Sequence, residues 1–534
     1  MRQLFTGVLF LVGLSPVSSL AQSIPAGSEF QINSETSNNQ AYPAVAMDLL
    51  GNFVVVWESD GQDGDRTGVF GQRYDSTGAP LGTEFQVNTY TTGVQFRPAV
   101  AMTALGDFVV VWDSEFGDGS LDGIFGQFFD NAGKRQGREF PVNTFTTGEQ
   151  VGPKVEADGV GNFTVIWESN GQDGSGYGIF GQRFDSRATK VGAEFQVNTY
   201  TYGDQSYPSI ASDPNGNFTV VWQSYLQDGS DFGVFGQRFG SNGSKRGGEF
   251  QVNTSTAYDQ IFPSVAVAAL GDFVVVWSDL EAAQRRLLGQ HFGSGGAALG
   301  PEFQVKDLST EFLYVPSLAA DSSGNFVVTW ASANQDGDGF GVSAQQFESS
   351  GLKRGPEFQV NSFTTHDQNY SAVVMDRKGN FVVAWQSYGQ DGDKKGIFGQ
   401  RFTCIDIDGD GICDLQDVIL TAPASMATLD CHTPSTGRPT IQWDKGDFDR
   451  FRIFVSSDPN FPVGTRISSG DILLKKTSYL VPTRKWRSAC LKAVAANAFN
   501  PTLFIEVFGV NVNVPKSAPN RKTFSQIVKV SVTH

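Results

Sequence analysis

Hydrophobic positions along the chain fall into short runs that recur about every 55 residues. In the first copy the runs lie at 42–48, 52–59, 68–75 and 84–89, and Gly, Asp, Asn and Pro separate them. Runs rich in β-branched and aromatic residues between such turn formers predict β-strands. The second run is continuously apolar over Phe53–Trp57, which predicts a strand buried on both faces. Each copy therefore predicts one sheet of four short strands.

Three kinds of residue mark the register of this repeat. Successive tryptophans lie 55, 55, 55, 55, 53 and 55 residues apart, the Glu-Phe pairs keep the same steps, and seven glutamines also keep register. Four strands in a unit of this length are typical of a propeller blade, whereas a lone sheet of this size would bury too little apolar surface to fold by itself. The sequence therefore predicts an all-β fold with a seven-bladed β-propeller. The markers are Trp57, Trp112, Trp167, Trp222, Trp277, Trp330 and Trp385; Glu29, Glu84, Glu139, Glu194, Glu249, Glu302 and Glu357; and Gln72, Gln127, Gln182, Gln237, Gln290, Gln345 and Gln400.

The two ends of the repeat array predict how the ring closes. The first Glu-Phe segment, Glu29–Asn33, precedes every tryptophan strand, and the last repeat runs into Cys404 without such a segment. Pairing of Glu29–Asn33 with Gly396–Phe402 would complete the seventh blade and remove two open sheet edges. We therefore expect a propeller over residues 22–403 that is closed by its N-terminal strand.

Closure also predicts which loops share a face. Because the strands of a blade alternate in direction, the acidic loop at 60–66 and the crossover at 89–98 lie on one face, and short turns such as Leu49–Asn52 lie on the other. Long loops on a rigid scaffold are where binding usually occurs. A binding protein should show exposed aromatic residues among the crossovers, whereas an enzyme should show one deep charged cleft.

The acidic loops have two interpretations. Calcium takes six to eight oxygen ligands, and each loop offers only one or two carboxylates, so a cation site would need further donors. The alternative is a hairpin loop in which Gly adopts positive φ and Asp caps its own backbone. The fifth repeat has a shorter loop that contains Arg285 and Arg286. The candidate cation or ligand residues are Asp63, Asp65, Asp118, Asp122, Asp173, Asp228, Asp231, Asp336, Asp338, Asp391 and Asp393.

Repeated glutamines predict a structural role, because a catalytic group is needed once and these residues recur. Gln72 and its equivalents lie within strands, where they face solvent or tie neighbouring blades together. A second set of glutamines stands shortly before Pro and beside aromatic residues in the crossovers. This placement fits either a link that holds neighbouring blades together, which we call a bracket, or sugar binding. We favour the bracket. This second set consists of Gln40, Gln95, Gln150, Gln205, Gln260 and Gln368.

A twelve-residue acidic loop begins at Asp406. Its spacing matches a calcium loop, with carboxylates at the ligand positions, Gly411 at the sharp turn and the Ile412 carbonyl as a further ligand. The loop resembles thrombospondin type 3 and dockerin calcium repeats, although Asp417 stands where Glu is usual and no helix precedes it. The resemblance implies one structural calcium ion. Its expected ligands are Asp406, Asp408, Asp410, Ile412, Asp414 and Asp417.

All four cysteines lie near or beyond residue 400. An even number in an exported chain suggests two disulfides, and four cysteines allow three pairings. We favour Cys404–Cys413 and Cys431–Cys490, because each pair then lies within one local unit.

The tail beyond the calcium loop differs in character from the repeats. Its apolar runs alternate as in a half-exposed sandwich, and Trp443 is a candidate core residue. This pattern resembles a fibronectin type III or immunoglobulin-like module. The expected domains are a signal peptide at 1–21, the propeller at 22–403, a calcium-binding linker at 404–420 and a β-sandwich at 421–534.

The net charge and the N-terminal segment indicate which partners and which location the protein has. A formal net charge of −17 argues against nucleic acid or anionic membranes as partners, because both require clustered Lys and Arg. Arg2, an apolar stretch and small residues before Ala21 are typical of a signal peptide. A membrane anchor is the alternative, but Gly13 and Pro16 break the apolar run. No later stretch is apolar enough to predict a membrane span.

Catalytic motifs are sparse. The four histidines show no metal-ligand spacing, and the chain contains no GxSxG elbow or phosphate-binding loop. Irregular residues gather in or next to the short loop of the fifth repeat, where Glu281 and His291 accompany the two arginines. An arginine pair could clamp a carboxylated sugar. We do not favour an enzyme.

The repeat resembles the units of exported bacterial β-propeller repeat proteins over residues 29–402, and this resemblance says little about a ligand. We predict a secreted or cell-surface, calcium-binding interaction or adhesion protein. As a monomer, it would present a propeller loop face to a glycan or protein ligand. The alternative is an extracellular carbohydrate-active hydrolase or lyase on the same scaffold.

Overall fold

The computed structural model describes residues 22–281, 284–309 and 315–404, together with the strands of the C-terminal part. The chain divides into two compact units, Met1–Thr403 and Cys404–His534. All elements among the described residues are β-strands. None of these residues belongs to a helix of the length and hydropathy that a membrane span needs.

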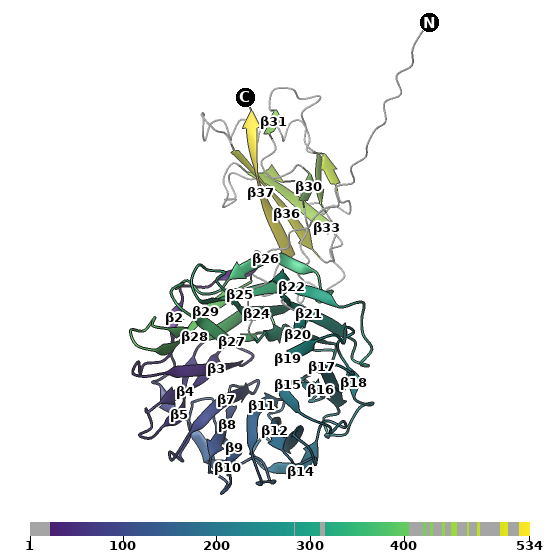
Figure 1. Ribbon diagram of the computed structural model, residues 1–534. Coiled ribbons are helices and arrows are strands. Elements are labelled where there is room, and N and C mark those ends of the chain that lie inside the picture. Colours follow the sequence, from purple (N-terminus) through teal and green to yellow (C-terminus); the bar gives the residue numbers. More distant parts are fainter. Residues whose placement is uncertain are drawn as a thin grey trace. The chain divides into compact units, whose positions relative to one another are not determined.

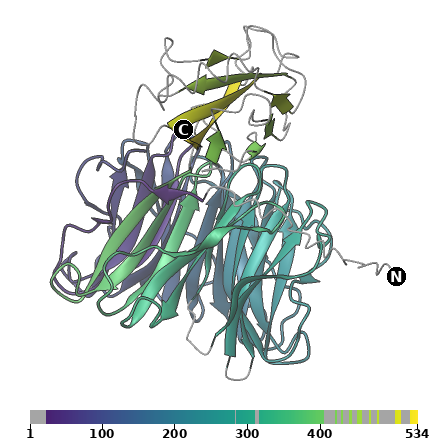
Figure 2. The ribbon, with the colours of Figure 1, turned by 90° about the horizontal axis from the view of Figure 1, so that it is seen from above.

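The first unit consists of seven antiparallel sheets around a common centre (Figure 1), and their strands run side by side through the thickness of the ring (Figure 2). Each sheet uses consecutive strands from the inside of the ring outwards. This arrangement confirms the predicted seven-bladed β-propeller. Blades 1 to 3 are β3 (Gln40–Met47), β4 (Phe53–Asp60), β5 (Thr67–Tyr74) and β6 (Phe85–Gln86); β7 (Gln95–Met102), β8 (Phe108–Glu115), β9 (Asp122–Phe129) and β10 (Arg135–Pro141); β11 (Gln150–Ala157), β12 (Phe163–Asn170), β13 (Tyr177–Phe184) and β14 (Lys190–Gln196). Blades 4 to 6 are β15 (Gln205–Ser212), β16 (Phe218–Tyr225), β17 (Phe232–Phe239) and β18 (Phe250–Gln251); β19 (Asp259–Val267), β20 (Phe273–Glu281), β21 (Gln284–Phe292) and β22 (Phe303–Ser309); β23 (Ser317–Ala320), β24 (Phe326–Ala333), β25 (Phe340–Phe347) and β26 (Lys353–Gln359).

The second strand of each blade carries the core, because it packs against both neighbouring blades. In β8, Val110 and Trp112 pack in one cluster with Val54 and Val56 of the preceding blade. All seven marker tryptophans are fully buried. Truncating such a residue to Ala typically costs about 3–5 kcal/mol. The continuous apolar run in each repeat therefore reflects a strand with no solvent-facing side.

The seventh blade closes the ring with strands from both ends of the unit. β27 (Gln368–Met375), β28 (Phe381–Tyr388) and β29 (Lys395–Thr403) form its inner part. Its outer edge comes from β2 (Phe30–Gln31), which pairs antiparallel with Phe398 and Gly399 of β29, and from β1 (Ile24–Pro25), which pairs with Phe402 and Thr403. The predicted closure by the N-terminal strand is confirmed.

The second unit contains strands in two sheets, in the orders β30-β32-β35 and β31-β37-β36-β33-β34. The β-sandwich interpretation stays a prediction. The calcium loop at 406–417, the signal peptide and three of the four cysteines lie outside the described residues, while Cys404 is buried directly after β29. The strands are β30 (Leu420–Ala422), β31 (Thr428–Asp430), β32 (Thr440–Trp443), β33 (Arg450–Ser456), β34 (Ile467–Ser468), β35 (Ser478–Leu480), β36 (Thr502–Val510) and β37 (Thr523–Thr533).

Candidate functional site

The acidic loops and the crossovers share one face, as predicted from the strand directions. The Asp60 N–H, at the start of an acidic loop, donates to the Asn39 carbonyl at the end of a crossover (2.9 Å). We call this the crossover face, and the opposite one, which carries the turns at 48–52 and 75–79 and their equivalents, the turn face.

A three-residue bracket occupies the acidic loop of most blades. In blade 1, Asn88 Nδ2 donates to Asp63 Oδ2 (2.9 Å) and to Gln95 Oε1 of the next blade (3.2 Å). Asn88 Oδ1 accepts the Val69 N–H at 2.9 Å. The first loop carboxylate is thus committed to the scaffold, and the crossover glutamines are buried in the predicted bracket. The same Asn-to-Asp and Asn-to-Gln bonds recur at Asn33, Asn143, Asn198, Asn253 and Asn361.

The other candidate loop carboxylates are mostly exposed, and three of them accept backbone N–H groups. Asp65 Oδ2 accepts the Gly93 N–H (2.8 Å), Asp338 Oδ2 accepts the His366 N–H (2.9 Å), and Asp393 Oδ2 accepts the Asn38 N–H (2.8 Å). Within the described ranges, no three His, Cys, Asp or Glu side chains are grouped so that they could hold a metal ion. Cation binding by these loops stays a prediction.

The strand glutamines are structural, but their partners differ from those expected. Gln72 Nε2 donates to the carbonyls of Arg73 (2.9 Å) and Gly82 (3.3 Å), so it ties a strand to the following turn of the same blade. A second bracket joins neighbouring blades through the marker glutamates. Glu84 accepts the N–H (2.6 Å) and Oγ (2.9 Å) of Ser34, and Gln62 Nε2 at 2.5 Å.

The junction between blades 5 and 6 departs from both brackets. The fifth repeat lacks the loop Asp, Lys306 stands where the bracket Asn should be, and Leu313 stands in place of the crossover Gln. Lys306 Nζ instead forms an ion pair with both carboxylate oxygens of Glu357, at 2.8 and 2.9 Å. Loss of all three bracket residues at one junction indicates that they work as a unit.

A ring of strained residues surrounds the centre on the crossover face. Each has positive φ at a bulge near the start of an inner strand, for example 51° at Tyr42 and 48° at Arg97. Bulky residues rarely adopt such angles, and bulges often re-aim side chains at functional sites. We call these residues the inner ring: Tyr42, Arg97, Gly152, Tyr207, Phe262 and Tyr370.

Side chains of the preceding blade hold the inner ring in place. The residue after the marker tryptophan accepts the N–H of the next ring residue. Glu58 accepts from Arg97 at 3.1 Å, and Glu168 accepts from Tyr207 at 2.8 Å. Asp113, Gln223 and Gln386 do the same for Gly152, Phe262 and Tyr42, at 3.0, 3.1 and 3.2 Å.

Aromatic side chains dominate the inner ring. The Tyr42 and Tyr370 rings meet edge to face with centroids 4.6 Å apart, and Tyr207 and Phe262 meet similarly at 4.8 Å. Tyr207 is 52% exposed.

Across the described residues, every large exposed aromatic side chain lies on the crossover face, whereas most large exposed aliphatic ones lie on the turn face. This distribution matches the expectation for a binding protein. The exposed aromatics are Tyr42, Tyr90, Phe116, Tyr202, Tyr207, Tyr225, Tyr258 and Tyr388.

Charged groups join the ring in blades 1 to 3. Arg97 Nε lies 3.5 Å from a carboxylate oxygen of the fully buried Asp113. Burial raises the pKa of Glu58 and of Glu168 to about 7, although the hydrogen bond that each carboxylate accepts lowers the pKa. Burial also raises the pKa of Asp113 well above its usual range. Lys154, two residues beyond Gly152, is solvent-accessible yet surrounded by the inner strands, and this desolvation lowers its pKa.

The enzyme candidates of the fifth repeat do not form one site. Arg286 Nε pairs with Asp279 Oδ2 at 2.6 Å. His291 lies near the far end of β21, where it contacts the rings of Phe303 and Phe326. The structure therefore separates His291 from the shortened loop beside which the sequence placed it.

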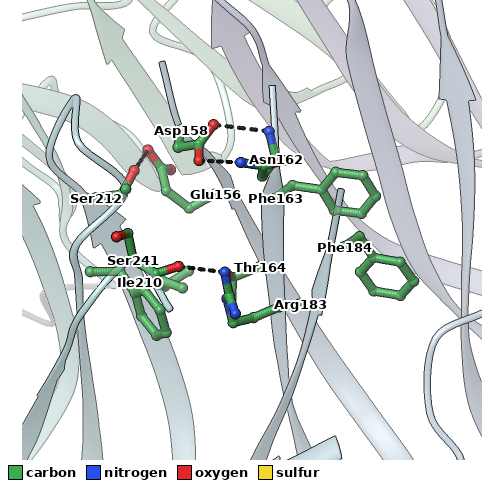
Figure 3. Close-up of a pocket in the computed structure, with 12 residues that line it drawn as sticks. Glu156, Asp158, Asn162, Phe163, Thr164, Arg183, Phe184, Ile210, Ser212 and Ser241 are labelled. Atoms are coloured by element: carbon green, nitrogen blue, oxygen red, sulfur yellow. Dashed lines mark hydrogen bonds between the residues drawn. The ribbon is translucent and has the colours of Figure 1, made fainter. Parts of the chain in front are cut away.

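A small cavity lies between blades 3 and 4 near the turn face (Figure 3). Glu156 points into it and accepts the Ser212 hydroxyl at 3.3 Å, and Asn162 donates twice to Asp158, at 2.9 and 2.8 Å. Burial raises the pKa of Glu156 to about 7. The other blades carry Ala or Val at this position. The cavity is separate from the inner ring.

The sequence contains a signal for the inner ring. Aligning the seven repeats shows that the position of Tyr42 changes to Arg97 and Gly152, and that of Ala44 changes to Lys154. Such departures within a strict repeat mark sites that the scaffold does not require.

Comparison with known proteins finds similar solved structures, all at low sequence identity. No protein-family model and no curated protein matches the chain. A Dyadobacter fermentans protein of unknown function has 10% identity over 72% of this chain and 98% of its own, with a TM-score of 0.44. A PL25 ulvan lyase bound to -[GlcA(1-4)Rha3S]- has 10% identity over 71% and 95%, with a TM-score of 0.43. A Penicillium chrysogenum α-L-arabinanase complexed with arabinobiose has 11% identity over 70% and 98%, with a TM-score of 0.40.

Two of these solved structures carry activities of the class that the sequence analysis kept as its alternative. At such low identities and TM-scores we draw no functional argument from the likeness.

Proposed function

We propose that the protein is an exported carbohydrate-binding protein whose ligand lies over the inner ring on the crossover face. The observation that carries this proposal is the set of four aromatic residues, Tyr42, Tyr207, Phe262 and Tyr370, at equivalent bulges. Aromatic rings offer apolar faces against which the C–H faces of sugars pack, at low entropic cost. Gathering of exposed aromatics on one face supports the same surface.

Strain at the inner ring supports a functional rather than a structural origin. A Tyr, Arg or Phe at positive φ costs of order 1–3 kcal/mol, and such residues cluster where binding or catalysis needs them. Here the cost is offset at five of the six ring positions by a hydrogen bond from the ring N–H to the neighbouring blade, as at Tyr207 and Glu168. The ring is thus held rigid before any ligand arrives.

A carbohydrate-active hydrolase or lyase is the second candidate, because two carboxyl groups are tuned for proton transfer. Glu58 and Glu168 have pKa values raised to about 7 by burial, and they lie in blades 1 and 3 beside the aromatic ring. A carboxyl group with a pKa near the working pH can donate or accept a proton during glycoside cleavage. Binding without turnover uses the same surface, so an experiment must separate the two.

The test is binding to a glycan and peptide array, followed by incubation with a polysaccharide panel. A binding protein retains glycans without releasing products. An enzyme releases oligosaccharides, and Glu58→Gln and Glu168→Gln remove this activity whereas Asp338→Asn, an exposed carboxylate on the same face, does not. Binding to peptides alone would contradict both candidates.

We further propose one structural calcium ion in the loop at 406–417 and disulfides Cys404–Cys413 and Cys431–Cys490. The loop spacing supports the calcium ion, and the even number of cysteines supports the disulfides. Peptide mapping without reduction tests the pairing, because any other connectivity would appear as a different pair of linked peptides.

A further inference from the structure

Two cations in the inner strands have no counterpart in the other blades. Arg97 stands at a ring position that is Tyr, Phe, Gly or Val in the other blades. Lys154 stands at a position occupied elsewhere only by Ala or Ser. The fold is built from near-identical repeats, so it does not require either charge. The residues equivalent to Lys154 are Ala44, Ala99, Ser209, Ser264, Ser317 and Ala372.

Lys154 cannot form the hydrogen bond that two of its serine equivalents accept. Ser209 Oγ accepts the Val265 N–H of the next inner strand at 3.2 Å, and Ser317 Oγ accepts the Val373 N–H at 3.2 Å. A lysine ammonium has no lone pair with which to accept such a bond. Among the described residues, the Lys154 ammonium forms no hydrogen bond or ion pair, and it remains solvent-accessible. The chain thus holds an unpaired cation beside the aromatic ring.

Arg97 is oriented toward the same place. Its backbone is fixed by the bond to Glu58, and its guanidinium carbon lies 4.6 Å from the centroid of the Phe96 ring. Nε faces Asp113 at 3.5 Å, and the side chain is 47% exposed. One edge of the guanidinium is therefore anchored, while its terminal amino groups stay available for a ligand.

Gly152 interrupts the row of large side chains in the inner ring. The other ring positions carry Tyr, Phe or Arg97, whereas Gly152 has no side chain, and a Cβ atom there would lie 3.3 Å from Glu168 Oε1, so Glu168 lines this gap. Asp113 links the two cationic strands, since it faces Arg97 and accepts the Gly152 N–H at 3.0 Å. Lys154 lies two residues beyond Gly152 on the same strand, and two residues along a strand span roughly 6–7 Å. Arg97 and Lys154 therefore flank a gap in the aromatic ring.

We propose that Arg97 and Lys154 bind the anionic group of an acidic carbohydrate, a carboxylate or a sulfate, in the gap at Gly152. This inference rests on the proposed function and names its ligand class. The neighbouring carboxyls Glu58, Asp113 and Glu168 are engaged with backbone N–H groups, so the cations are the groups left for the ligand. The net charge of the chain acts weakly at this point, because physiological salt screens charges beyond about 8 Å.

The test is calorimetric titration of the full chain with three oligosaccharide sets: neutral, carboxylated (oligogalacturonates) and sulfated (carrageenan oligomers). Lys154→Ala introduces the residue of blades 1, 2 and 7 and should preserve the fold. We expect it to weaken binding of one acidic set by about 10–100-fold, the scale of a lost charge-assisted hydrogen bond, with no change for neutral sugars. Arg97→Tyr, the residue of blades 1, 4 and 7, should act in the same direction.

Arg66→Ala provides a matched control, because Arg66 is an exposed cation on the crossover face that pairs with Glu115 at 3.0 Å. It should bind acidic sugars as the unaltered protein does. Equal affinity of Lys154→Ala for acidic sugars would overturn this inference. If the unaltered protein binds only neutral sugars, the inference fails and the proposed function stands. If it binds no sugar, both fail.

Discussion

Replacing Asn143 with Ala should destabilise the propeller by breaking one complete bracket between blades 2 and 3. Asn143 Nδ2 donates to Asp118 Oδ2 and Gln150 Oε1, both at 3.1 Å, and Asn143 Oδ1 accepts the Ile124 N–H at 2.8 Å. Gln150 is fully buried. An unsatisfied buried polar group costs about 1–3 kcal/mol, so loss of partners for Gln150 and the Ile124 N–H should cost about 2–6 kcal/mol.

The assay is thermal unfolding by differential scanning calorimetry. A unit of about 400 residues has an unfolding entropy of roughly 0.8 kcal/mol per kelvin, so Tm should fall by about 3–7 °C.

Lys306→Ala is the matched control at the junction that lacks the bracket. Its ion pair with Glu357 is partly exposed and should contribute less than about 1 kcal/mol. Equal shifts for the two variants would refute the inference that the bracket is the stronger tie between blades.

Three further outcomes are expected. Because burial raises the pKa of Glu156 from 4.5 to about 7, the folded state keeps a proton that the unfolded chain loses, so stability should fall as pH rises from about 4.5 to 7. Glu156→Ala, which introduces the residue of most other blades, should make Tm fall less steeply with pH. An unchanged dependence of Tm on pH would count against a buried carboxyl at Glu156. Calcium should protect the chain near residue 410 from proteolysis, and Asp410→Asn should remove this protection; identical digestion with calcium and with a chelator would contradict the calcium loop. Tyr207→Ala should weaken glycan binding by about tenfold with little change in Tm, whereas Tyr202→Ala, on a crossover loop, should not, and equal losses would argue against the inner ring.

The fold could be predicted from the sequence because the residues that determine it are local and repeated. Seven tryptophan strands in register predict seven blades, and the displaced Glu29–Asn33 segment predicts the closing strand. The closure reuses the bracket that the marker glutamates form at most other junctions, since Glu29 accepts the Ser362 N–H and Gln390 Nε2, both at 2.5 Å. A segment that carries the same bonding groups as its equivalents can take the same place at the end of the array.

The inner ring was harder to foresee. The carboxylates of the acidic loops stand out in the sequence, yet Asp63 and its equivalents accept hydrogen bonds from scaffold asparagines. Positive φ at Tyr42 depends on a hydrogen bond from Gln386, 344 residues away in the chain, and no local pattern reveals it. Raised pKa values at Glu58 and Glu168 likewise result from burial between blades. Only the departures at Arg97, Gly152 and Lys154 were visible beforehand.

Hydrogen exchange measured by mass spectrometry, with and without a bound glycan, tests the central claim most directly. The account predicts that the glycan protects amides at the starts of the inner strands, around residues 41–44, 206–209, 261–264 and 369–372, and leaves the turn face unchanged. Protection confined to the turn face, or to the outer strands, would contradict a carbohydrate site at the inner ring.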